Sequence, residues 1–424
     1  MFDLKYIRAH PDRIREAIRA KRENADLDRI LALDAQRRAH LVEVEQLKAE
    51  RNRASQEIGQ RKAAGEDAAA AIAEMKQVSE RIKALDARVR EVDEQLGCLL
   101  AWVPNVPHPS VPEGDESANQ LVRRWGEVRE GEELRDHLTL GEELGILDFG
   151  AASRLSGHGW ATFVGLGARL QRALIDFMID RHVAAGYREV RIPYAVREES
   201  LFGCGQLPKL REDMYAITDE DLFLIPTAEV PLTNFYREEE LQLEDLPLQL
   251  VAYSPCWRRE AGSYGKETRG LMRLHQFDKV EMVKLVTPES SYDELESLTR
   301  DAEGVLQALE LPYRVMLLAT GDLSFAAAKC YDIELWAPGE GRWLEVSSCS
   351  NFEAFQARRC NLRYRDEARK LRHVHSLNGS GVALPRLTIA LLEHHQTRSG
   401  SVRIPEPLRP YLGGIAELTP AAEG

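Results

Sequence analysis

The sequence contains no long apolar run and no paired cysteines. Its 424 residues are 44% apolar and 29% charged, and no stretch approaches the ~20 apolar residues that span a membrane. The N-terminal MFDLKYIRAHPDRIREAIRA carries acidic residues and no apolar core, so we expect no signal peptide. The six cysteines, at 98, 204, 256, 330, 349 and 360, form no CxxC pair, which argues against a zinc knuckle or a disulfide framework. We therefore expect a cytoplasmic protein with reduced cysteines and no membrane partner.

Both common glycine-rich phosphate-binding motifs are also missing. A P-loop needs GxxxxGK[ST], but the only Gly-Lys pair, Gly265-Lys266, is followed by Glu267. The segment GLGARL (165–170) lacks the third glycine of a dinucleotide-binding GxGxxG. If this chain binds phosphates, side-chain cations must hold them.

Residues 28–97 have the spacing of a coiled coil. In the second half, apolar residues alternate at intervals of three and four: Met75, Val78, Ile82, Leu85, Val89, Val92, Leu96 and Leu99. The first half keeps this spacing with weaker residues: Val44, Leu47, Arg51, Ala54 and Ile58. Gly65 can break the run between them. We predict two helices of about 30 residues that pair antiparallel into an arm roughly 45 Å long.

The charge of this arm is uneven although the whole chain has a net charge of −13. Residues 48–62 and 76–90 each hold five basic and two acidic residues, net +3, and an antiparallel hairpin places them alongside each other. From charge alone, a solvated coiled-coil surface is the favoured interpretation. The alternative is a basic stripe for nucleic-acid phosphates.

The chain is expected to comprise two domains. Residues 1–103 form an N-terminal domain that contains the arm, a proline-rich linker covers 104–118, and the second domain covers 119–424. In the second domain we expect a helix at 166–186, a strand at 187–196 interrupted by Pro193, further strands, and a helix within 289–310. The regular βαβ alternation is missing, so an α+β fold with an antiparallel sheet flanked by helices is predicted.

The stretch CWRREAGSYGKETRGLMRLHQFDKVE (256–281) gathers six cations and four carboxylates. A strand ending in Arg258 and Glu260, a glycine-containing turn and a returning strand would place alternate residues on one face. The returning strand would present Arg273, His275, Phe277, Lys279 and Glu281 together. A solvated charged face is one interpretation. A platform for ATP is the better one, because the ring can stack on a base and the arginines can bind phosphate.

With these segments considered together, the chain resembles the bacterial-type seryl-tRNA synthetases, a family of class II aminoacyl-tRNA synthetases, over essentially its full length. WRRE (257–260) with RLHQFDKVE (273–281) is similar to motif 2 of that class, and NGSGVALPRLTIALLEHHQ (378–396) to motif 3. The segment ending near Pro193, followed by GCGQLPK (203–209), resembles motif 1 and its continuation. PTAE (226–229) and LEVSSCSNFEAFQARR (344–359) match two further family signatures.

The resemblance implies a role for each motif residue. Arg258 and Arg386 would be the catalytic residues, Arg258 bridging the ATP α-phosphate and the serine carboxylate, and Arg386 lying near the γ-phosphate and adenine. Phe277 would stack on adenine, and Glu260 would contact the adenine side of the nucleotide. The ATP-binding set that it implies is Arg258, Arg259, Glu260, Arg273, Phe277, Glu345, Val346, Ser347, Ser348 and Arg386.

A serine site and a metal site are implied in the same way. Thr227, Ala228 and Glu229 would lie near the amino group of L-serine, Glu281 and Ser380 near its hydroxyl, and Arg258 at its carboxylate. Glu345 and Ser348 would bind a Mg²⁺ that bridges phosphates, since hard oxygen donors suit that ion. Without the resemblance, Ser380 in NGSG could equally be a turn residue. His275, His394 and His395 are expected to be structural.

The resemblance also gives the arm a partner. In this family the N-terminal arm grips the long variable arm and elbow of the tRNA, which implies contacts with tRNA(Ser), and with tRNA(Sec) where the host has it. Arg51, Arg53, Lys83 and Arg88 are the candidate contact residues. A homodimer and no DNA partner are expected. Two alternatives are a seryl-like ligase that charges a carrier protein and a non-catalytic RNA-binding paralogue.

Overall fold

The computed structural model describes residues 1–129, 134–261 and 269–420. The greater part of the expected glycine-containing turn, residues 262–268, therefore lies outside the described residues. The chain divides into two compact units, Met1–Pro104 and Asn105–Gly424. Within the described residues, no helix is both long and apolar enough to cross a membrane.

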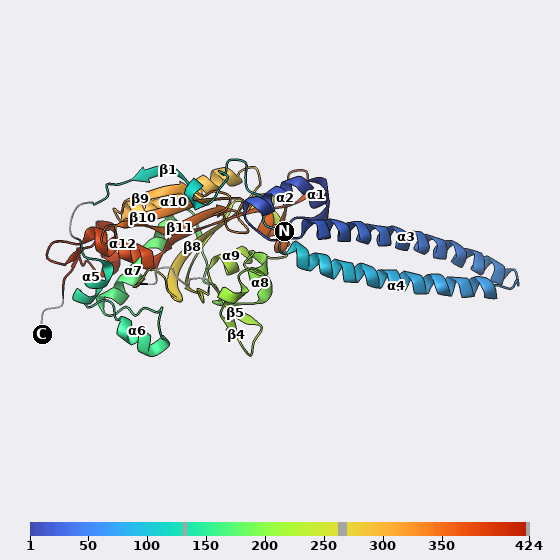
Figure 1. Ribbon diagram of the computed structural model, residues 1–424, viewed down its shortest axis with the longest axis horizontal. Coiled ribbons are helices and arrows are strands. Elements are labelled where there is room, and N and C mark those ends of the chain that lie inside the picture. The colour runs from blue at the N-terminus through green and yellow to red at the C-terminus, as the bar shows by residue number, and fades with distance from the viewer. Residues whose placement is uncertain (130–133, 262–268, 421–424) are drawn as a thin grey trace. The chain divides into compact units, whose positions relative to one another are not determined.

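The first unit is a helical hairpin with two short helices before it. After α1 (Leu4–Ala9) and α2 (Pro11–Ala20), the long helices α3 (Leu27–Ala63) and α4 (Ala69–Leu100) run antiparallel (Figure 1). The side chain of Asp26 accepts a hydrogen bond from the backbone N–H of Arg29 and so caps α3. The predicted coiled-coil arm is confirmed, and α4 buries the expected seam residues Ile82, Leu85, Val89, Val92 and Leu96.

Ion pairs between the two long helices show their register. Arg37 lies 2.5 Å from Asp93, and Lys48 lies 3.8 Å from Asp86. The second pair joins residues of the two basic stretches, 48–62 and 76–90, which therefore lie alongside each other. Arg51 is half-buried at the seam, whereas the side chains of Arg53, Lys83 and Arg88 are exposed.

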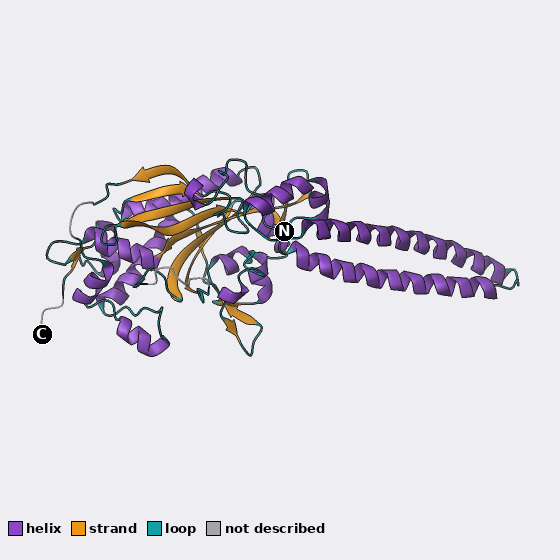
Figure 2. Ribbon diagram, in the orientation of Figure 1, coloured by secondary structure: helices purple, strands orange, loops and turns teal. Residues whose placement is uncertain are grey.

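The second unit is built on one large, mainly antiparallel sheet (Figure 2). Its strand order is β1-β9-β10-β11-β14-β8-β7-β2, and only the β2–β7 pair is parallel. The strands are β1 (Gln120–Trp125), β9 (Tyr313–Leu317), β10 (Lys329–Ala337), β11 (Arg342–Asn351), β14 (His375–Ala383), β8 (Gln276–Val286), β7 (Leu248–Trp257) and β2 (Arg188–Glu189). The predicted antiparallel sheet with flanking helices is thus confirmed.

Side chains alternate between the two faces of the central strands. In β8, Val280, Met282 and Val286 join the core formed with α7 (Leu166–Ala184), α10 (Ser291–Ala308) and α12 (Leu384–His395). Val283 and Leu285 instead join a second core with α8 (Glu198–Gly203) and α9 (Glu229–Thr233). The odd-numbered positions of β8 therefore face this second side of the sheet.

Smaller elements complete the second unit. The helices are α5 (His137–Glu143), α6 (Phe149–Ser156) and α11 (Phe355–Arg359), and the 3₁₀ helices are η1 (Glu116–Ala118), η2 (Arg211–Asp213), η3 (Leu243–Asp245) and η4 (Glu406–Leu412). Three minor sheets contain β3 (Ala195–Val196), β4 (Ala216–Ile217) and β5 (Leu222–Leu224); β6 (Glu240–Gln242), β12 (Arg363–Arg365) and β13 (Leu371–His373); and β15 (Val402–Arg403) and β16 (Glu417–Leu418).

The motif 2 strands are shorter than predicted. β7 ends at Trp257, so Arg258 and Glu260 follow the strand, and strand alternation does not place them on one face. The backbone φ of Glu260 is +54°, which is incompatible with an extended strand. β8 begins at Gln276, so Arg273 and His275 precede it, whereas Phe277, Lys279 and Glu281 alternate along one face as predicted.

Candidate active site

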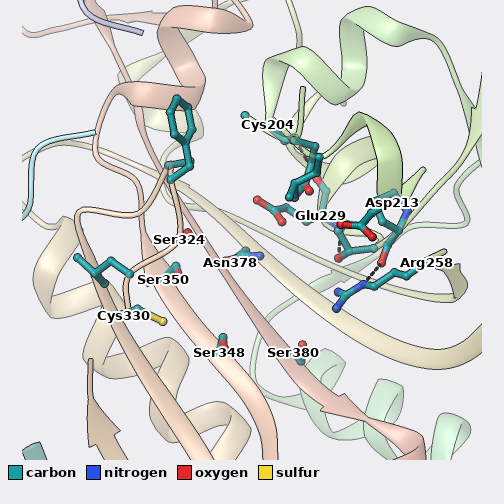
Figure 3. Close-up of a pocket in the computed structure, with 18 of the residues that line it drawn as sticks. Cys204, Asp213, Glu229, Arg258, Ser324, Cys330, Ser348, Ser350, Asn378 and Ser380 are labelled. Carbon is teal, nitrogen blue, oxygen red and sulfur yellow. Dashed lines mark hydrogen bonds between the residues drawn. The ribbon is translucent and has the colours of Figure 1, made fainter. Parts of the chain in front are cut away.

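The second face of the large sheet is hollowed by two adjoining cavities. The larger has a volume of about 690 Å³ and the smaller about 270 Å³. They share six lining residues: Arg258, Glu260, Arg273, Lys279, Glu345 and Ser380. Figure 3 shows how β8, β14 and β11 form the floor of the larger cavity, while Glu229 and Arg258 reach it from the opposite side.

A polar pocket in the larger cavity is centred on Glu281, whose side chain is fully buried. Glu281 and Ser380 are direct partners across the β8–β14 pair, and the Ser380 hydroxyl lies 3.4 Å from the Glu281 carboxylate. Asn378 donates to the other carboxylate oxygen at 2.9 Å, and Lys279 forms an ion pair with Glu281 at 2.6 Å. A buried charge needs such partners, so this cluster is an oriented set of donors and acceptors.

Glu229 provides a second buried carboxylate on the opposite wall. It is the last residue of the PTAE segment and the first residue of α9, and its Oε1 accepts a hydrogen bond of 2.7 Å from Gln356. Burial, followed by the charge of Glu281, raises the pKa of Glu229 to about 7. Thr227 lines the same wall, and its hydroxyl accepts from the backbone N–H of Glu229 at 3.2 Å.

Arg258 lines both the larger cavity, which contains the two carboxylates, and the smaller one. Its Nε donates to the carbonyl of Pro226 at 3.3 Å, and its guanidinium carbon lies 5.1 Å from the centre of the Phe277 ring. Both contacts hold the side chain on the cavity wall. The charge of Arg258 is therefore directed at the space that the two cavities share.

The smaller cavity combines an aromatic ring with cations. Besides the six shared residues, it is lined by Leu271, Met272, Leu274, Phe277, Val346, Ala383, Pro385 and Arg386. Glu260 and Arg273 form an ion pair on its wall. Arg386 donates to the carbonyl of Glu345 at 2.6 Å and lies 3.4 Å from the Glu345 carboxylate. Pro385 is the second residue of α12, which begins at Leu384.

Three oxygen donors lie together where β10 meets β11. The Ser348 hydroxyl donates to Asp332 at 2.6 Å and lies 3.2 Å from Glu345. Burial and the charge of Glu345 raise the pKa of Asp332 well above its usual value. A cation would relieve this repulsion between carboxylates, so the donor set fits a hard divalent ion such as Mg²⁺.

Three of the residues predicted for the ATP and serine sites do not line either cavity. The backbone N–H of Arg259 donates to the carbonyl of Asp213 at 2.9 Å, and its side chain lines neither cavity. Ala228 is fully buried. Ser347 donates its hydroxyl to the carbonyl of Ser380 at 2.6 Å, away from the cavity. The other ATP- and serine-site residues named from the sequence are all lining residues.

No sequence motif assigns a role to four polar residues of the site: Lys279, Asp332, Gln356 and Asn378. Lys279 is expected from the sequence only as a neighbour of Phe277 and Glu281 on one strand face. Asp332 becomes significant through the strand register, because it is the direct partner of Ser348 in the β10–β11 pair. The available signal was a carboxylate between apolar residues of a strand, as Asp332 lies between Tyr331 and Ile333 in KCYDIELWA (329–337).

Comparisons with known proteins agree with this architecture. The family profile "Seryl-tRNA synthetase N-terminal domain" matches residues 1–107, and "tRNA synthetase class II core domain (G, H, P, S and T)" matches residues 215–395. The serine–tRNA ligase of Caldanaerobacter subterraneus subsp. tengcongensis is 54% identical, covering 97% of this chain and 98% of its own. That of Acetivibrio thermocellus is 52% identical, covering 99% and 100%.

Solved structures give the same result. The seryl-tRNA synthetase of Pyrococcus horikoshii complexed with ATP is 39% identical and covers 100% of both chains, with a TM-score of 0.94. The cytoplasmic serine–tRNA ligase of Naegleria fowleri in complex with AMP is 27% identical, covers 97% of this chain and 96% of its own, and has a TM-score of 0.88. The chain therefore belongs to the seryl-tRNA synthetase family of class II aminoacyl-tRNA synthetases and is an ATP-dependent serine–tRNA ligase.

Proposed function

We propose that the two adjoining cavities are the serine and ATP sites of this ligase. In the first step the serine carboxylate attacks the α-phosphorus of ATP and releases pyrophosphate, giving seryl-adenylate. In the second step serine is transferred to the 3′ end of tRNA(Ser). The observation that carries the proposal is that Arg258 lies on the boundary between a pocket of buried carboxylates and a pocket with an aromatic ring.

Arg258 is proposed to bridge the α-phosphate and the serine carboxylate. Both reactants are anions, so a fixed cation between them suppresses their repulsion and stabilises the charge of the phosphorane-like transition state. No protein nucleophile is needed, because the substrate carboxylate is the nucleophile. The protein contributes alignment and electrostatic stabilisation.

Specificity for serine is proposed to reside in the buried carboxylates. Glu281 and Ser380 meet the substrate hydroxyl, and Glu229 and Thr227 lie at its ammonium group. Alanine would leave the partners of the hydroxyl unpaired in a buried site, which is strongly unfavourable. Ala228 is proposed to act through its place in the PTAE segment, since its side chain does not line the cavities.

The nucleotide site is proposed to comprise Phe277, which stacks on adenine, together with the charged residues of the smaller cavity. Arg386 lies at the γ-phosphate end, and Arg273 and Glu260 flank the nucleotide. Mg²⁺ is proposed to bind Glu345 and Ser348, with Asp332 added to this set from its contact with Ser348. The ion would neutralise phosphate charge when bound. Arg259 and Ser347, whose side chains line neither cavity, are proposed to support these groups indirectly.

The arm is proposed to bind the variable arm and elbow of tRNA. Arg53, Lys83 and Arg88 present exposed cations on two neighbouring helices, and Arg51 lies half-buried between them. RNA recognition by shape and phosphate suits such a polar helical surface. We further propose a cytoplasmic homodimer that binds no DNA, and that serylates tRNA(Sec) in a host that contains it.

A paired assay tests this function. Serine-dependent exchange of pyrophosphate into ATP is measured first, and charging of purified tRNA(Ser) is measured on the same preparation. The proposal requires both activities. Exchange without tRNA charging would support a ligase for a carrier protein, and binding of tRNA with neither activity would support a non-catalytic paralogue.

A further inference from the structure

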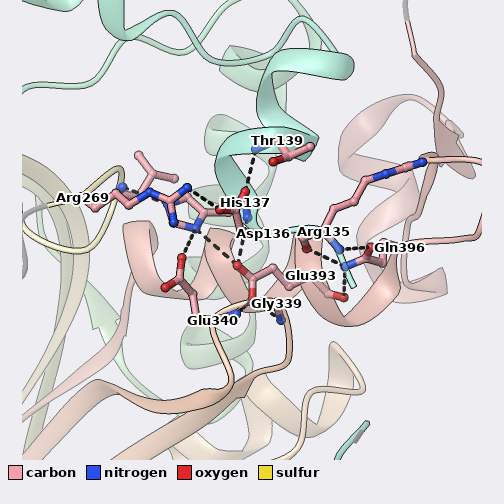
Figure 4. Close-up of polar contacts among 10 residues, drawn as sticks. Arg135, Asp136, His137, Thr139, Arg269, Gly339, Glu340, Glu393 and Gln396 are labelled. Carbon is pink, nitrogen blue, oxygen red and sulfur yellow. Dashed lines mark hydrogen bonds and ion pairs between the residues drawn. The ribbon is translucent and has the colours of Figure 1, made fainter. Parts of the chain in front are cut away.

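A buried polar junction lies outside both cavities, around His137 at the start of α5 (Figure 4). The His137 side chain is fully buried. Three segments that are distant in sequence meet around His137: the end of the motif 2 turn at Arg269–Leu271, the β10–β11 turn at Gly339–Glu340, and Glu393 in α12. Each segment continues into a wall of the smaller cavity.

Glu393 connects two of these segments through its carboxylate. One oxygen accepts from the backbone N–H of His137 at 2.9 Å and lies 3.3 Å from His137 Nδ1. The other accepts from the backbone N–H groups of Gly339 at 2.9 Å and Glu340 at 3.1 Å. Glu393 is fully buried, so these donors replace the water that the carboxylate has lost.

The third segment is held by the other ring nitrogen. The backbone N–H of Leu271 donates to His137 Nε2 at 3.2 Å. Arg269, two residues earlier, forms an ion pair of 2.6 Å with Asp136. Between them, Gly270 has φ of +61°, and a Cβ at this position would lie only 2.3 Å from His137 Nε2. The ring and the backbone therefore fit together only with glycine at this position.

These contacts fix the tautomer of His137. Nε2 accepts a hydrogen bond, so it carries a lone pair, and the hydrogen of the neutral ring is on Nδ1. Nδ1 lies 3.2 Å from Glu340 and 3.3 Å from Glu393, and it donates between two carboxylates. Burial raises the pKa of Glu340, and the charge of Glu393 acts in the same direction.

The same tautomer argues against a metal ion at this position. The ligand atoms of His137, Glu340 and Glu393 lie within 4.8 Å of one another, a spacing that a divalent ion could bridge. A metal bound at Nδ1 needs that nitrogen to be free of hydrogen. Because Nε2 is engaged by the Leu271 N–H, the hydrogen remains on Nδ1, and the cluster is a hydrogen-bonded junction.

Each segment that the junction holds contributes to the proposed ATP site. Residues 271–274 line the smaller cavity, and the first of them, Leu271, is the residue whose backbone N–H donates to His137. Arg386 precedes Glu393 by seven residues, or about two helical turns of α12. Glu345 and Val346 follow Glu340 in the same hairpin. We propose that His137 is a positioning residue for the ATP site, which acts by accepting the Leu271 N–H and holding residues 271–274 against α12.

The two roles of the ring can be separated by two substitutions. In His137→Gln, the longer amide can place its oxygen near the position of Nε2 and retain the acceptor for Leu271. In His137→Asn, the shorter amide can still donate toward Glu393 but does not reach Leu271. Because one buried hydrogen bond is lost, we expect His137→Asn to raise the KM for ATP about five- to tenfold. The KM for serine should change less than about twofold, and His137→Gln should stay within about twofold for both substrates.

Both KM values are measured by serine-dependent pyrophosphate exchange, with thermal unfolding of each variant as a check of folding. His395→Asn is the matched control, because this buried histidine of α12 contacts the Leu309 carbonyl instead, at 2.8 Å. It should lower the unfolding temperature and leave the KM for ATP unchanged. Equal effects of His137→Asn and His137→Gln on the KM for ATP, or no effect of His137→Asn, would overturn the inference.

This inference rests on the proposed ATP site, and Arg386→Ala separates the two. If Arg386→Ala leaves the KM for ATP unchanged, the site itself is misassigned. If Arg386→Ala raises it and His137→Asn does not, only the role of His137 fails. Should His137→Asn not fold, ¹⁵N-histidine NMR of the intact protein reads the tautomer directly, with His137→Gln used for assignment. A neutral Nδ1–H ring is expected, and an Nε2–H ring would contradict the inference.

Discussion

Glu281 and Ser380 face each other across two antiparallel strands, and the Ser380 hydroxyl lies 3.4 Å from the buried Glu281 carboxylate. The Ser380 hydroxyl donates to Glu281, so what remains on both groups is lone pairs that can accept a further hydrogen bond. A substrate hydroxyl that enters this pocket can donate to Glu281, and it can accept from Ser380 when the Ser380 hydrogen turns from the carboxylate to the substrate. The strand register fixes the separation of the two groups, so the pocket is formed before the substrate arrives.

We predict that Glu281→Gln and Ser380→Ala narrow the discrimination between serine and alanine. Each variant should lower kcat/KM for serine about tenfold or more, because a hydrogen bond to the substrate is lost, while the KM for ATP changes little. The measurement is pyrophosphate exchange with each amino acid. Ser254→Ala, at a buried serine of β7 outside both cavities, is the control. Unchanged serine-to-alanine ratios in both test variants would remove the pair from the hydroxyl pocket.

A second prediction concerns the pH dependence that Glu229 confers. Its pKa is raised to about 7, chiefly by burial. The serine ammonium group favours the ionised carboxylate, so the affinity for serine should increase as the pH rises from about 6 to about 8. The sign for stability is the opposite. A carboxyl whose pKa is raised by folding contributes fully to folding stability at pH values below its pKa in the unfolded chain. This contribution is lost as the pH rises through about 7, the pKa of Glu229 in the folded protein.

The KM for serine measured across this pH range, in the wild type and in Glu229→Gln, tests the prediction. Glu229→Gln should bind serine more weakly and should have a flatter pH profile, because the titrating group is gone. The KM for ATP in the same preparations serves as the internal control. If the pH profile of the serine KM is the same in both proteins, Glu229 does not contact the ammonium group in an ionisable form.

A third prediction addresses the metal donors. Asp332→Asn and Ser348→Ala should each raise the concentration of Mg²⁺ that gives half-maximal pyrophosphate exchange, by about threefold or more, because each removes an oxygen from the set around Glu345. A titration with Mg²⁺ at saturating serine and ATP measures this. Glu334→Gln is the control, since Glu334 lies on the same strand β10 but pairs with Arg314 instead. Identical Mg²⁺ titrations for the wild type and both test variants would contradict the assignment.

The sequence predicted the arm and the sheet well because both depend on periodic burial. Spacings of three and four identify the seam at Ile82 and Leu85, and period-two alternation identifies Phe277 and Glu281 on one face. The strand ends were placed less accurately. Local propensity does not reveal that Glu260 adopts a positive φ, since tertiary contacts select that conformation.

The rest of the site could not be read from single motifs. Asp332 meets Ser348 only because β10 and β11 pair in one register, and Asn378 meets Glu281 only because β14 lies beside β8. Gln356 reaches Glu229 from a helix 127 positions away in sequence. Such pairings depend on the topology of the sheet and on packing, neither of which leaves a short sequence pattern.

A fourth prediction concerns the arm. A protein that lacks residues 28–97 should still form seryl-adenylate and should charge tRNA poorly, because the adenylation residues all lie between 227 and 386. Neutralising Arg51, Arg53, Lys83 and Arg88 should reproduce part of the loss and flatten the salt dependence of tRNA binding, since fewer counterions are released. Both half-reactions are measured on the same preparations across a salt series.

The control for the charge variant is the pair Arg37→Gln and Arg38→Gln. These cations lie outside the two basic stretches, in ion pairs with Asp93 and Asp34. Neutralising them should change the salt dependence of tRNA binding less than neutralising the four residues of the basic stretches. If the truncated enzyme charges tRNA as well as the intact one does, the arm is only a structural appendage. If truncation also abolishes adenylation, the arm and the catalytic unit are not separable.

The position of Arg258 between the two cavities can be tested most directly by serine-dependent pyrophosphate exchange in Arg258→Ala. A cation that bridges both anions stabilises the transition state, so its loss should lower the rate on the order of 10³-fold in a protein that remains folded. Arg259→Ala, at the neighbouring arginine whose side chain lines neither cavity, should lose less than about tenfold. Near-normal exchange in folded Arg258→Ala would contradict the account.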